Sequence, residues 1–288
     1  MEIAWIGTGI MGAPMARRLL AAGHRVKVYN RSLEKARALV ADRATLCADP
    51  AEAAIDAEAV FIMVPDTPDV QAVAARIEPV LQPGQLVIDM STVSPESERE
   101  IAQRFAARGA DYLDAPVSGG EPGAIDGTLT IMAGGGEAVF ARARPLLEHL
   151  GSRVTWMGPS GAGQMTKLCN QIAVTLTLEA AAEALKFAVA GGLDAAKVLE
   201  AIGAGAAASW QLSNLGPKIL ARDYRPGFFV KLIRKDLRLV AEAARKSGLA
   251  LPGLALMTSM FNAAAAMGHD LDGTQAVADA LDSAANLK

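Results

Sequence analysis

Short apolar runs alternate with longer amphipathic stretches up to about residue 155, and this alternation constrains the fold more than any other feature. Each run has the length of one buried strand, and each intervening stretch repeats its apolar residues at the period of a helix. Strands separated by helices in this way form parallel βαβ units, with helices on both faces of one sheet. The runs are IAWIG, RVKVYN, AVFIMV, LVIDMS and YLDAPV, and GTLTIMAGG predicts a further strand at the edge of the same sheet.

The pattern changes after residue 160. From Gln164 to Ala190 the chain contains no glycine or proline, which predicts a helix of roughly 27 residues, ~40 Å long. Charged side chains such as Lys167 and Glu183 interrupt it, so we expect a buried helix and not a membrane span. Further helical patterns follow. The sequence therefore predicts an α/β domain over residues 1–160 and an all-helical domain over residues 161–288, opened by a long interdomain helix.

The charge and the cysteine and histidine content exclude several classes of protein. A formal net charge of −3 gives no reason to expect nucleic acid or an anionic membrane as a partner. Two cysteines, Cys47 and Cys169, cannot form a disulfide framework, and three scattered histidines show no metal-ligand spacing. The segment MEIAWIG carries an acid where a signal peptide carries cations. We therefore expect a cytoplasmic protein without a metal site, in which Cys169 is a small core residue. The apolar helical half favours a homo-oligomer, a dimer or a tetramer.

Three glycines, Gly7, Gly9 and Gly12, follow the first apolar run in G-x-G-x-x-G spacing and precede an amphipathic helix. In a dinucleotide-binding unit the first glycine allows a tight turn, the second lets a pyrophosphate approach the backbone, and the third lets helix and strand pack closely. The helix N-terminus adds free N–H groups and a positive dipole. The alternative is a tight turn that needs glycine for its geometry alone. The place of the loop, directly after the first strand, favours a Rossmann-type doubly wound sheet that binds a dinucleotide.

The stretch VYNRS at the end of the second apolar run bears on which dinucleotide is bound. An acid at this place would hydrogen-bond the adenosine ribose of NAD. Here Asn30 cannot repel a phosphate, Arg31 offers a planar fork that matches phosphate oxygens, and Ser32 lies where a helix N-cap could add donors. This favours NADP(H), with NAD(H) as the weaker candidate. The alternative is an exposed arginine beside a helix-capping serine.

Two stretches carry groups suited to a reaction. DAPVSGGEPGAIDG places Ser118, Gly119 and Gly120 after a strand, where successive N–H groups can face a carboxylate; the alternative is a glycine-rich turn. GAGQMTKLCNQ places Lys167 and Asn170 three residues apart on one helix face. A desolvated lysine has a lowered pKa and can exchange a proton near pH 7, while Asn170 can hydrogen-bond a substrate oxygen. The alternative is a lysine whose stem lines the helix and whose ammonium group reaches solvent.

With these motifs the sequence resembles the β-hydroxyacid dehydrogenases, a family that includes 3-hydroxyisobutyrate dehydrogenase, tartronate semialdehyde reductase and the glyoxylate/succinic semialdehyde reductases. The resemblance covers nearly the whole chain. It rests on the ordered motifs GTGIMGAPMA, MVPDTPDV, DMSTVSP, DAPVSGGEPGAIDGTLTIMAGG, GAGQMTKLCNQ and FFVKLIRKDL. One departure is Asn170-Gln171, where members often have two asparagines.

The resemblance implies roles for individual residues. The glycines and further residues would contact the cofactor: Ile10 and Met11 at the pyrophosphate, Val64 and Pro65 along the groove, Thr92 at the nicotinamide half, and Lys235 from the helical domain. The substrate would meet Ser118, Gly119 and Gly120 at its carboxylate, Lys167 as catalytic acid/base, Asn170 as orienting group, and Phe228 and Trp210 as walls.

We therefore expect an NADPH-dependent reductase of small carboxylate-bearing aldehydes, which in reverse is a 3-hydroxyacid dehydrogenase. Three alternatives stay open. The first is an NAD-dependent 3-hydroxyisobutyrate dehydrogenase. An imine reductase shares the architecture, but it usually lacks the lysine that this chain has as Lys167. A non-catalytic NADP-binding module typically loses that lysine and gains basic appended segments.

Overall fold

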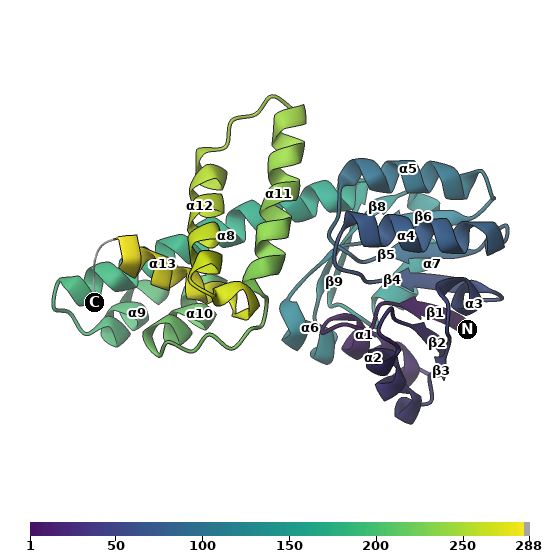
Figure 1. Ribbon diagram of the computed structural model, residues 1–288, viewed down its shortest axis with the longest axis horizontal. Helices are drawn as coiled ribbons and strands as arrows, with labels where there is room; N and C mark the ends of the chain where they lie inside the picture. The colour runs from purple at the N-terminus through teal and green to yellow at the C-terminus, as the bar shows by residue number, and fades with distance from the viewer. Residues whose placement is uncertain (285–288) are drawn as a thin grey trace. The chain divides into compact units, whose positions relative to one another are not determined.

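The structure, a computed structural model, describes residues 1–284. It forms two compact units, the first covering Met1–Lys167 and the second beginning at Leu168. The division falls inside helix α8 (Ala162–Ala190), which supplies the last residues of the first unit and the first residues of the second (Figure 1).

The first unit is built on one sheet, which has nine strands in the described part of the chain. The strand order is β3-β2-β1-β4-β5-β6-β8-β7, with β9 pairing with β8. Pairing is parallel from β3 to β6, whereas β8 runs antiparallel to β6 and β7. The parallel core confirms the predicted Rossmann-type sheet. The strands are β1 Glu2–Ile6, β2 Arg25–Tyr29, β3 Thr45–Leu46, β4 Ala59–Ile62, β5 Leu86–Asp89, β6 Asp111–Asp114, β7 Val117–Ser118, β8 Thr130–Gly135 and β9 Arg153–Gly158.

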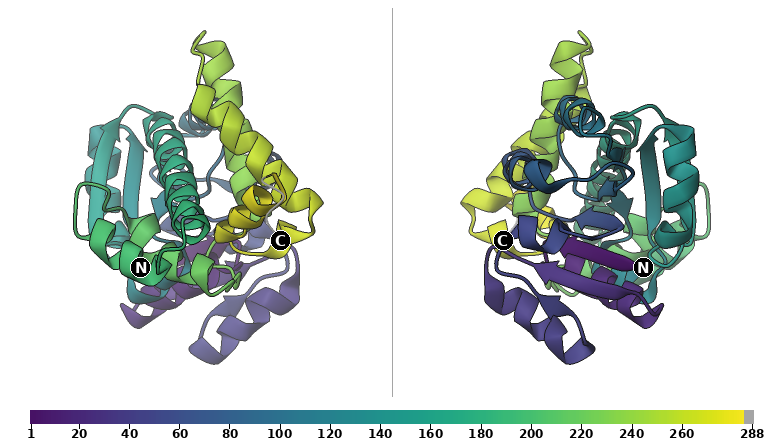
Figure 2. Two further views of the ribbon diagram at one scale, coloured as in Figure 1. Left: turned by 90° about the vertical axis from the view of Figure 1, so that its left-hand side faces the viewer. Right: turned by 90° about the vertical axis from the view of Figure 1, so that its right-hand side faces the viewer.

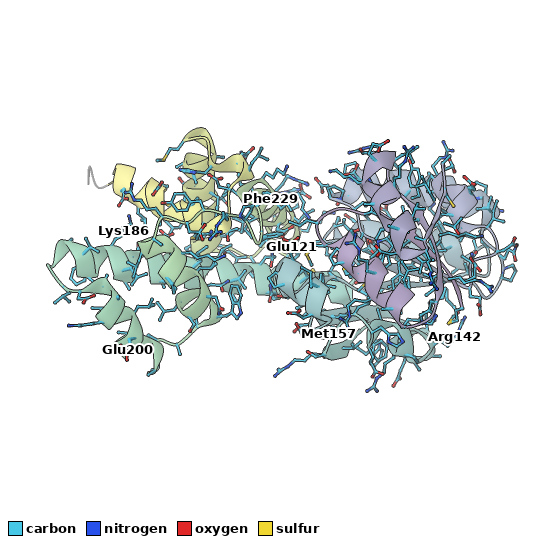
Figure 3. All side chains as sticks on the ribbon, turned by 90° about the horizontal axis from the view of Figure 1, so that it is seen from below. Glu121, Arg142, Met157, Lys186, Glu200 and Phe229 are labelled. Atoms are coloured by element: carbon cyan, nitrogen blue, oxygen red, sulfur yellow. The ribbon has the colours of Figure 1, made fainter. Side chains whose placement is uncertain are left out.

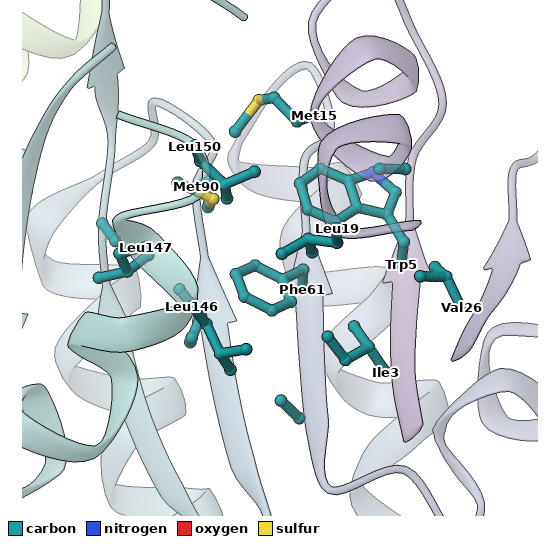
Figure 4. Packing of buried hydrophobic residues seen from close by; sticks show 14 of the residues in the cluster. Ile3, Trp5, Met15, Leu19, Val26, Phe61, Met90, Leu146, Leu147 and Leu150 are labelled. Atoms are coloured by element: carbon teal, nitrogen blue, oxygen red, sulfur yellow. The ribbon is translucent and has the colours of Figure 1, made fainter. Parts of the chain in front are cut away.

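Helices cover both faces of this sheet because successive strand residues point to opposite sides. Trp5 and Phe61 pack against α1 and α7, whereas Ile6 and Ile62 pack against α4 and α5. In Figure 2 the blue helices α4 and α5 lie on one side of the strands and the purple helices α1 and α2 on the other. Figure 4 shows Trp5 and Phe61 side by side, with their rings stacked at a centroid distance of 5.2 Å. The helices of this unit are α1 Gly12–Ala21, α2 Leu33–Arg37, α3 Pro50–Ala54, α4 Thr67–Ile77, α5 Pro95–Ala106, α6 Gly120–Asp126 and α7 Glu137–Leu147.

The regular elements described in the second unit are all helices, apart from one isolated bridge between Phe229 and Gly273. Its core gathers Leu185 of α8, Leu237 of α11 and Phe261 of α12. This confirms the all-helical second half. Besides α8 its helices are α9 Ala195–Gly203, α10 Trp210–Leu220, α11 Val230–Lys246, α12 Pro252–Ala266 and α13 Val277–Ala284.

Two local expectations were wrong. The strand predicted at the sheet edge, β8, has partners on both sides, because β9 pairs along its outer side. The sequence does not reveal β9, since the side chains of Arg153–Gly158 are mostly exposed and form no buried run. Cys169, expected in the core, is exposed. It shares the exposed side of α8 with Met165 and Ala173, while Leu168 and Gln171 lie on the buried side.

Candidate active site

The glycine loop forms the turn between β1 and α1. Gly7 has a φ of +102°, and a Cβ there would lie 2.1 Å from the Met63 carbonyl oxygen. A Cβ on Gly12 would lie 2.0 Å from the carbonyl oxygen of Gly7, so both positions require glycine. A Cβ on Gly9 would meet nothing within 4 Å, and no side chain caps the start of α1. Open space and uncapped N–H groups fit a bound pyrophosphate.

The strand order places this loop at a topological switch point. The chain proceeds from β1 to β2 and β3 on one side and to β4, β5 and β6 on the other. Ligands of open α/β sheets bind at the carboxyl ends of the strands at such a point. Ile10 and Met11 belong to the β1 loop, and the partly buried Val64 and the exposed Pro65 follow β4. Thr92, also partly buried, follows β5. The cofactor residues predicted in the first unit therefore follow neighbouring strand ends.

The three residues at the end of β2 differ in what their side chains do. The Asn30 Oδ1 accepts the Thr8 N–H at 3.0 Å, and its Nδ2 donates to the Ser32 carbonyl oxygen at 2.9 Å. Asn30 therefore ties the glycine loop to the β2 turn. Ser32 stands at the N-cap of α2, but its side chain makes no capping bond. Arg31 is 83 % exposed, and its Nη1 lies 2.8 Å from the Asp69 Oδ1.

The predicted carboxylate nest lies between β7 and α6. Ser118 ends β7, Gly119 has a φ of +136°, and Gly120 has a φ of +64° and begins α6. The chain thus passes from β7 almost directly into a short helix, and the alternative of an open glycine-rich turn does not describe this stretch. No side chain caps that helix. Its first N–H groups can donate hydrogen bonds to an anion.

Lys167 lies in the second turn of α8, as the last residue of the first unit, and is only 7 % exposed. The start of this helix is fixed by Asp114 at the end of β6, whose carboxylate accepts the N–H of Gly161 at 2.7 Å and of Gln164 at 2.9 Å. Burial raises the pKa of Asp114, and these backbone hydrogen bonds oppose the rise. A carboxylate at the N-terminus of a helix also interacts favourably with its dipole.

The remaining predicted residues lie in the second unit. Asn170 donates from its Nδ2 to the Gln171 Oε1 at 2.8 Å, and Gln171 donates in turn to Asp236. Asp236 is buried, and its Oδ1 lies 2.7 Å from the Lys235 Nζ. Asn170 and Lys235 thus belong to one polar cluster through two residues that the sequence reasoning missed. The signals available were an acid directly after the implied cofactor lysine and an amide directly after Asn170.

The two predicted wall residues differ in burial. Phe228 is partly buried beside the core of the second unit, whereas Trp210 is 63 % exposed at the start of α10. Among the described residues no group of three or more histidine, cysteine, aspartate or glutamate side chains could hold a metal ion. None of the described helices is long and apolar enough to cross a membrane.

A buried acidic group near the carboxyl ends of β5 and β6 was also missed. Asp89, Glu98 and Tyr112 are almost wholly buried, and the Tyr112 hydroxyl donates to the Glu98 Oε2 at 2.8 Å. Desolvation raises the pKa of Asp89 to about 6 and raises that of Glu98 well above its usual range. Asp89 also accepts the Ser91 N–H at 2.9 Å, which favours its ionised form.

Comparisons with known proteins agree with this arrangement. Residues 2–158 match the family model of the NAD binding domain of 6-phosphogluconate dehydrogenase. Residues 161–280 match that of the NAD-binding domain of NADP-dependent 3-hydroxyisobutyrate dehydrogenase. The 2-hydroxy-3-oxopropionate reductase of Escherichia coli is 40 % identical over 291 residues, covering 100 % of this chain and 99 % of that protein. An NAD-dependent L-serine dehydrogenase of Pseudomonas aeruginosa is 37 % identical, covering 90 % and 91 %.

The solved structures include a Mycobacterium tuberculosis 3-hydroxyisobutyrate dehydrogenase with L-serine, with a TM-score of 0.90 and 33 % identity over 97 % of this chain and 98 % of that one. Fold, glycine loop and comparisons together define an NAD(P)-dependent oxidoreductase that acts on hydroxyacids. The chain belongs to the β-hydroxyacid dehydrogenase family, which confirms the resemblance inferred from its motifs.

Proposed function

We propose that this chain is an NADPH-dependent reductase of small aldehydes that carry a carboxylate, and a 3-hydroxyacid dehydrogenase in the reverse direction. The observation that carries the proposal is the burial of Lys167 on a helix whose start is anchored by Asp114. A buried ammonium group on a fixed helix can act as a positioned general acid for a carbonyl oxygen. A solvated surface lysine would not be held in one position in this way.

When NADPH is bound, its nicotinamide would supply the hydride that the carbonyl carbon requires. Lys167 would donate a proton to the carbonyl oxygen, so that the aldehyde, the hydride and this proton together give the alcohol, and the neutral Lys167 amine would regain a proton from water. The N–H groups of Ser118, Gly119 and Gly120 bind the substrate carboxylate, and Asn170 orients the substrate through its amide. Val64, Pro65 and Thr92 line the cofactor groove, and Lys235 and Phe228 serve cofactor and substrate from the helical half. Residues 1–160 thus form the cofactor domain and residues 161–288 the substrate and oligomerisation domain.

Preference for NADPH rests on Arg31. No acid stands at the end of β2, and the exposed Arg31 guanidinium has donors in the planar arrangement that suits a phosphate. The Asn30 amide is already hydrogen-bonded to the Thr8 N–H and the Ser32 carbonyl oxygen. Asn30 therefore contributes to the NADPH preference only by being uncharged, so that it does not repel a phosphate. The NAD-dependent alternative requires the ribose hydroxyls to be recognised without the usual carboxylate.

The test is turnover with both cofactors on glyoxylate, succinic semialdehyde and tartronate semialdehyde, and in reverse on 3-hydroxyisobutyrate and L-serine. We expect NADPH oxidation with at least one acid-bearing aldehyde. The matched aldehyde without a carboxylate should lose at least tenfold, on the order of 10–10³, in kcat/KM, because the anion site is left unfilled. Equal efficiency on both aldehydes would refute the carboxylate assignment. Cofactor binding without any turnover would instead favour the non-catalytic module.

We also infer a homo-oligomer in the cytoplasm, a dimer or a tetramer. The helical unit exposes large apolar side chains, including Phe187 at 81 % and Trp210 at 63 %. Such surfaces are typical of protein interfaces. The two cysteines are free thiols, which suits a reducing compartment. Light scattering during size-exclusion chromatography measures the assembly, and a monomer at micromolar concentration would refute self-association.

A further inference from the structure

The loop between β5 and α5 is held by the side chain of a residue far away in the sequence. Gln164 is wholly buried, and its Oε1 accepts the Val93 N–H at 3.1 Å. Its Nε2 donates to the Ser91 carbonyl oxygen at 2.9 Å. The two hydrogen bonds lie on either side of Thr92. One amide therefore fixes the backbone both before and after this residue.

The groups around this amide are themselves anchored to strand ends. The Ser91 Oγ accepts the Val64 N–H at 3.0 Å, which ties the loop to the one that follows β4. The Gln164 N–H donates to Asp114 at the end of β6. Gln164 therefore joins two parts of the first unit, the loop around Thr92 and the start of α8. All these hydrogen bonds are buried or partly buried, where an unsatisfied partner is costly.

Gln164 also stands three residues before Lys167, on the same side of α8 and one turn away. A shift of the loop relative to α8 would change the separation between the Thr92 backbone and the Lys167 side chain. We propose that Gln164 is a positioning residue, which fixes the loop around Thr92 relative to Lys167 and so sets the approach of cofactor and acid. This rests on the proposed function, in which Thr92 serves the nicotinamide half and Lys167 donates the proton.

The decisive variant is Gln164→Met, which keeps a similar volume and removes both hydrogen bonds. Its matched control is Gln85→Met. Gln85 is also buried and makes three hydrogen bonds, but it lies at the amino end of β5, away from the loop. Both variants lose buried hydrogen bonds, so both should lower Tm. Loss of kcat should be confined to Gln164→Met, at about tenfold to a hundredfold, because small misplacements of reacting groups have effects of this order.

Gln164→Glu adds a pH signature. A protonated carboxyl can accept from Val93 and donate to the Ser91 carbonyl oxygen, whereas a carboxylate cannot donate. Three ionisable groups lie around the residue 164 side chain. Asp114 accepts the backbone N–H of residue 164, Asp89 accepts the Ser91 N–H, and Lys167 lies one turn further along α8. We expect kcat near the wild-type value at low pH and a progressive fall below it as pH rises.

Four measurements on the full chain decide the matter: kcat, the Kd of NADPH, Tm, and amide hydrogen exchange at Val93 without cofactor. Faster exchange and lower kcat in Gln164→Met, with a Kd within about threefold of wild type (a change under 1 kcal/mol), support the proposal. An unchanged kcat overturns it, as does an equal loss of kcat in Gln85→Met or a loss of NADPH affinity as large as the loss of kcat. If the wild type turns over no aldehyde with either cofactor, the proposed function fails, and the catalytic role of Gln164 fails with it.

Discussion

Replacing Asp69 by asparagine should strengthen the binding of NADPH while leaving NADH nearly unchanged, if Arg31 recognises the 2′-phosphate. In the structure Arg31 already has a partner, because its Nη1 lies 2.8 Å from the Asp69 Oδ1. A phosphate must compete with this carboxylate for the same guanidinium. Asp69→Asn removes the competitor and one negative charge from its surroundings.

The magnitude follows from the exposure of the pair. Arg31 is 83 % and Asp69 26 % exposed, so their ion pair is worth about 0–1 kcal/mol. A charge-assisted hydrogen bond to a phosphate is worth roughly 1.5–3 kcal/mol. The net contribution of Arg31 to NADPH binding in the wild type is then about 1–2 kcal/mol, or roughly 5- to 30-fold in Kd. Arg31→Ala should weaken NADPH by that factor, and Asp69→Asn should tighten it by up to about fivefold.

Fluorescence titration of each variant with NADPH and NADH, at two salt concentrations, measures these changes. The control is Asp42→Asn, which breaks a comparable exposed ion pair with Arg17 on the same unit. It should alter neither affinity. Because screening weakens exposed charge pairs, the NADPH effects should shrink at high salt. Arg31→Ala that weakens both cofactors equally, or Asp69→Asn that weakens NADPH, would refute the role of Arg31 in cofactor choice.

Three further perturbations test other parts of the site and fold. Lys167→Ala should lower kcat by on the order of 10²–10⁴ and leave NADPH binding intact. Lys167→Arg should not restore kcat, because a guanidinium group keeps its proton. Near-wild-type turnover in Lys167→Ala would remove Lys167 from the mechanism. Gly12→Ala should lower the free energy of unfolding, measured by urea denaturation, by about 1–3 kcal/mol, because its Cβ would overlap the Gly7 carbonyl oxygen. Gly9→Ala should weaken only the binding of the cofactor, measured by titration, because its Cβ meets no protein atom within 4 Å. Desolvation, with repulsion from Glu183, raises the pKa of Glu179 to about 7. The folded state therefore keeps a proton that the unfolded chain releases, and the free energy of unfolding falls as pH rises from 4.5 to about 7. Glu179→Gln should therefore raise the free energy of unfolding by up to about 3 kcal/mol at pH 8 and by little at pH 4.5. Its control is Glu200→Gln on the outward side of α9 (Figure 3), which should not change the free energy of unfolding at either pH. A gain that is the same at both pH values would contradict the raised pKa of Glu179.

The fold could be predicted where burial leaves a periodic signal. Strands β1, β4 and β5 are wholly or almost wholly buried and read as continuous apolar runs, and α8 was indicated by the absence of glycine and proline. The edge strand β9 leaves no such signal because its side chains are mostly exposed. The same is true of α6, whose glycines resemble those of an open turn. Tertiary pairing decides both elements, and local pattern cannot reveal it.

The site could be predicted only as far as residue type and order along the chain allow. The glycine loop and Lys167 stand in motifs that combine unusual residues with a strand or helix boundary. Gln164 and Asp236 stand in two of the quoted motifs, but their residue types do not single them out, because an amide or acid on a helix is ordinarily a solvated surface group. Their significance lies in burial and in hydrogen bonds to segments distant in the sequence. Only the folded chain reveals those contacts.

The carboxyl ends of β5 and β6 show how inward-facing polar groups support the candidate site. Asp89 and Asp114 end these two strands, and their carboxylates accept backbone N–H groups of the loop around Thr92 and of the start of α8. Burial raises the pKa of both, but these N–H donors favour the ionised form, whereas Glu98 faces repulsion from both acids. The Ser91 N–H thus favours the ionised form of Asp89, which anchors the start of the loop around Thr92. The loop around Thr92 and the helix bearing Lys167 are thus both fixed by strand-end acids, and Gln164 spans the remaining gap between them.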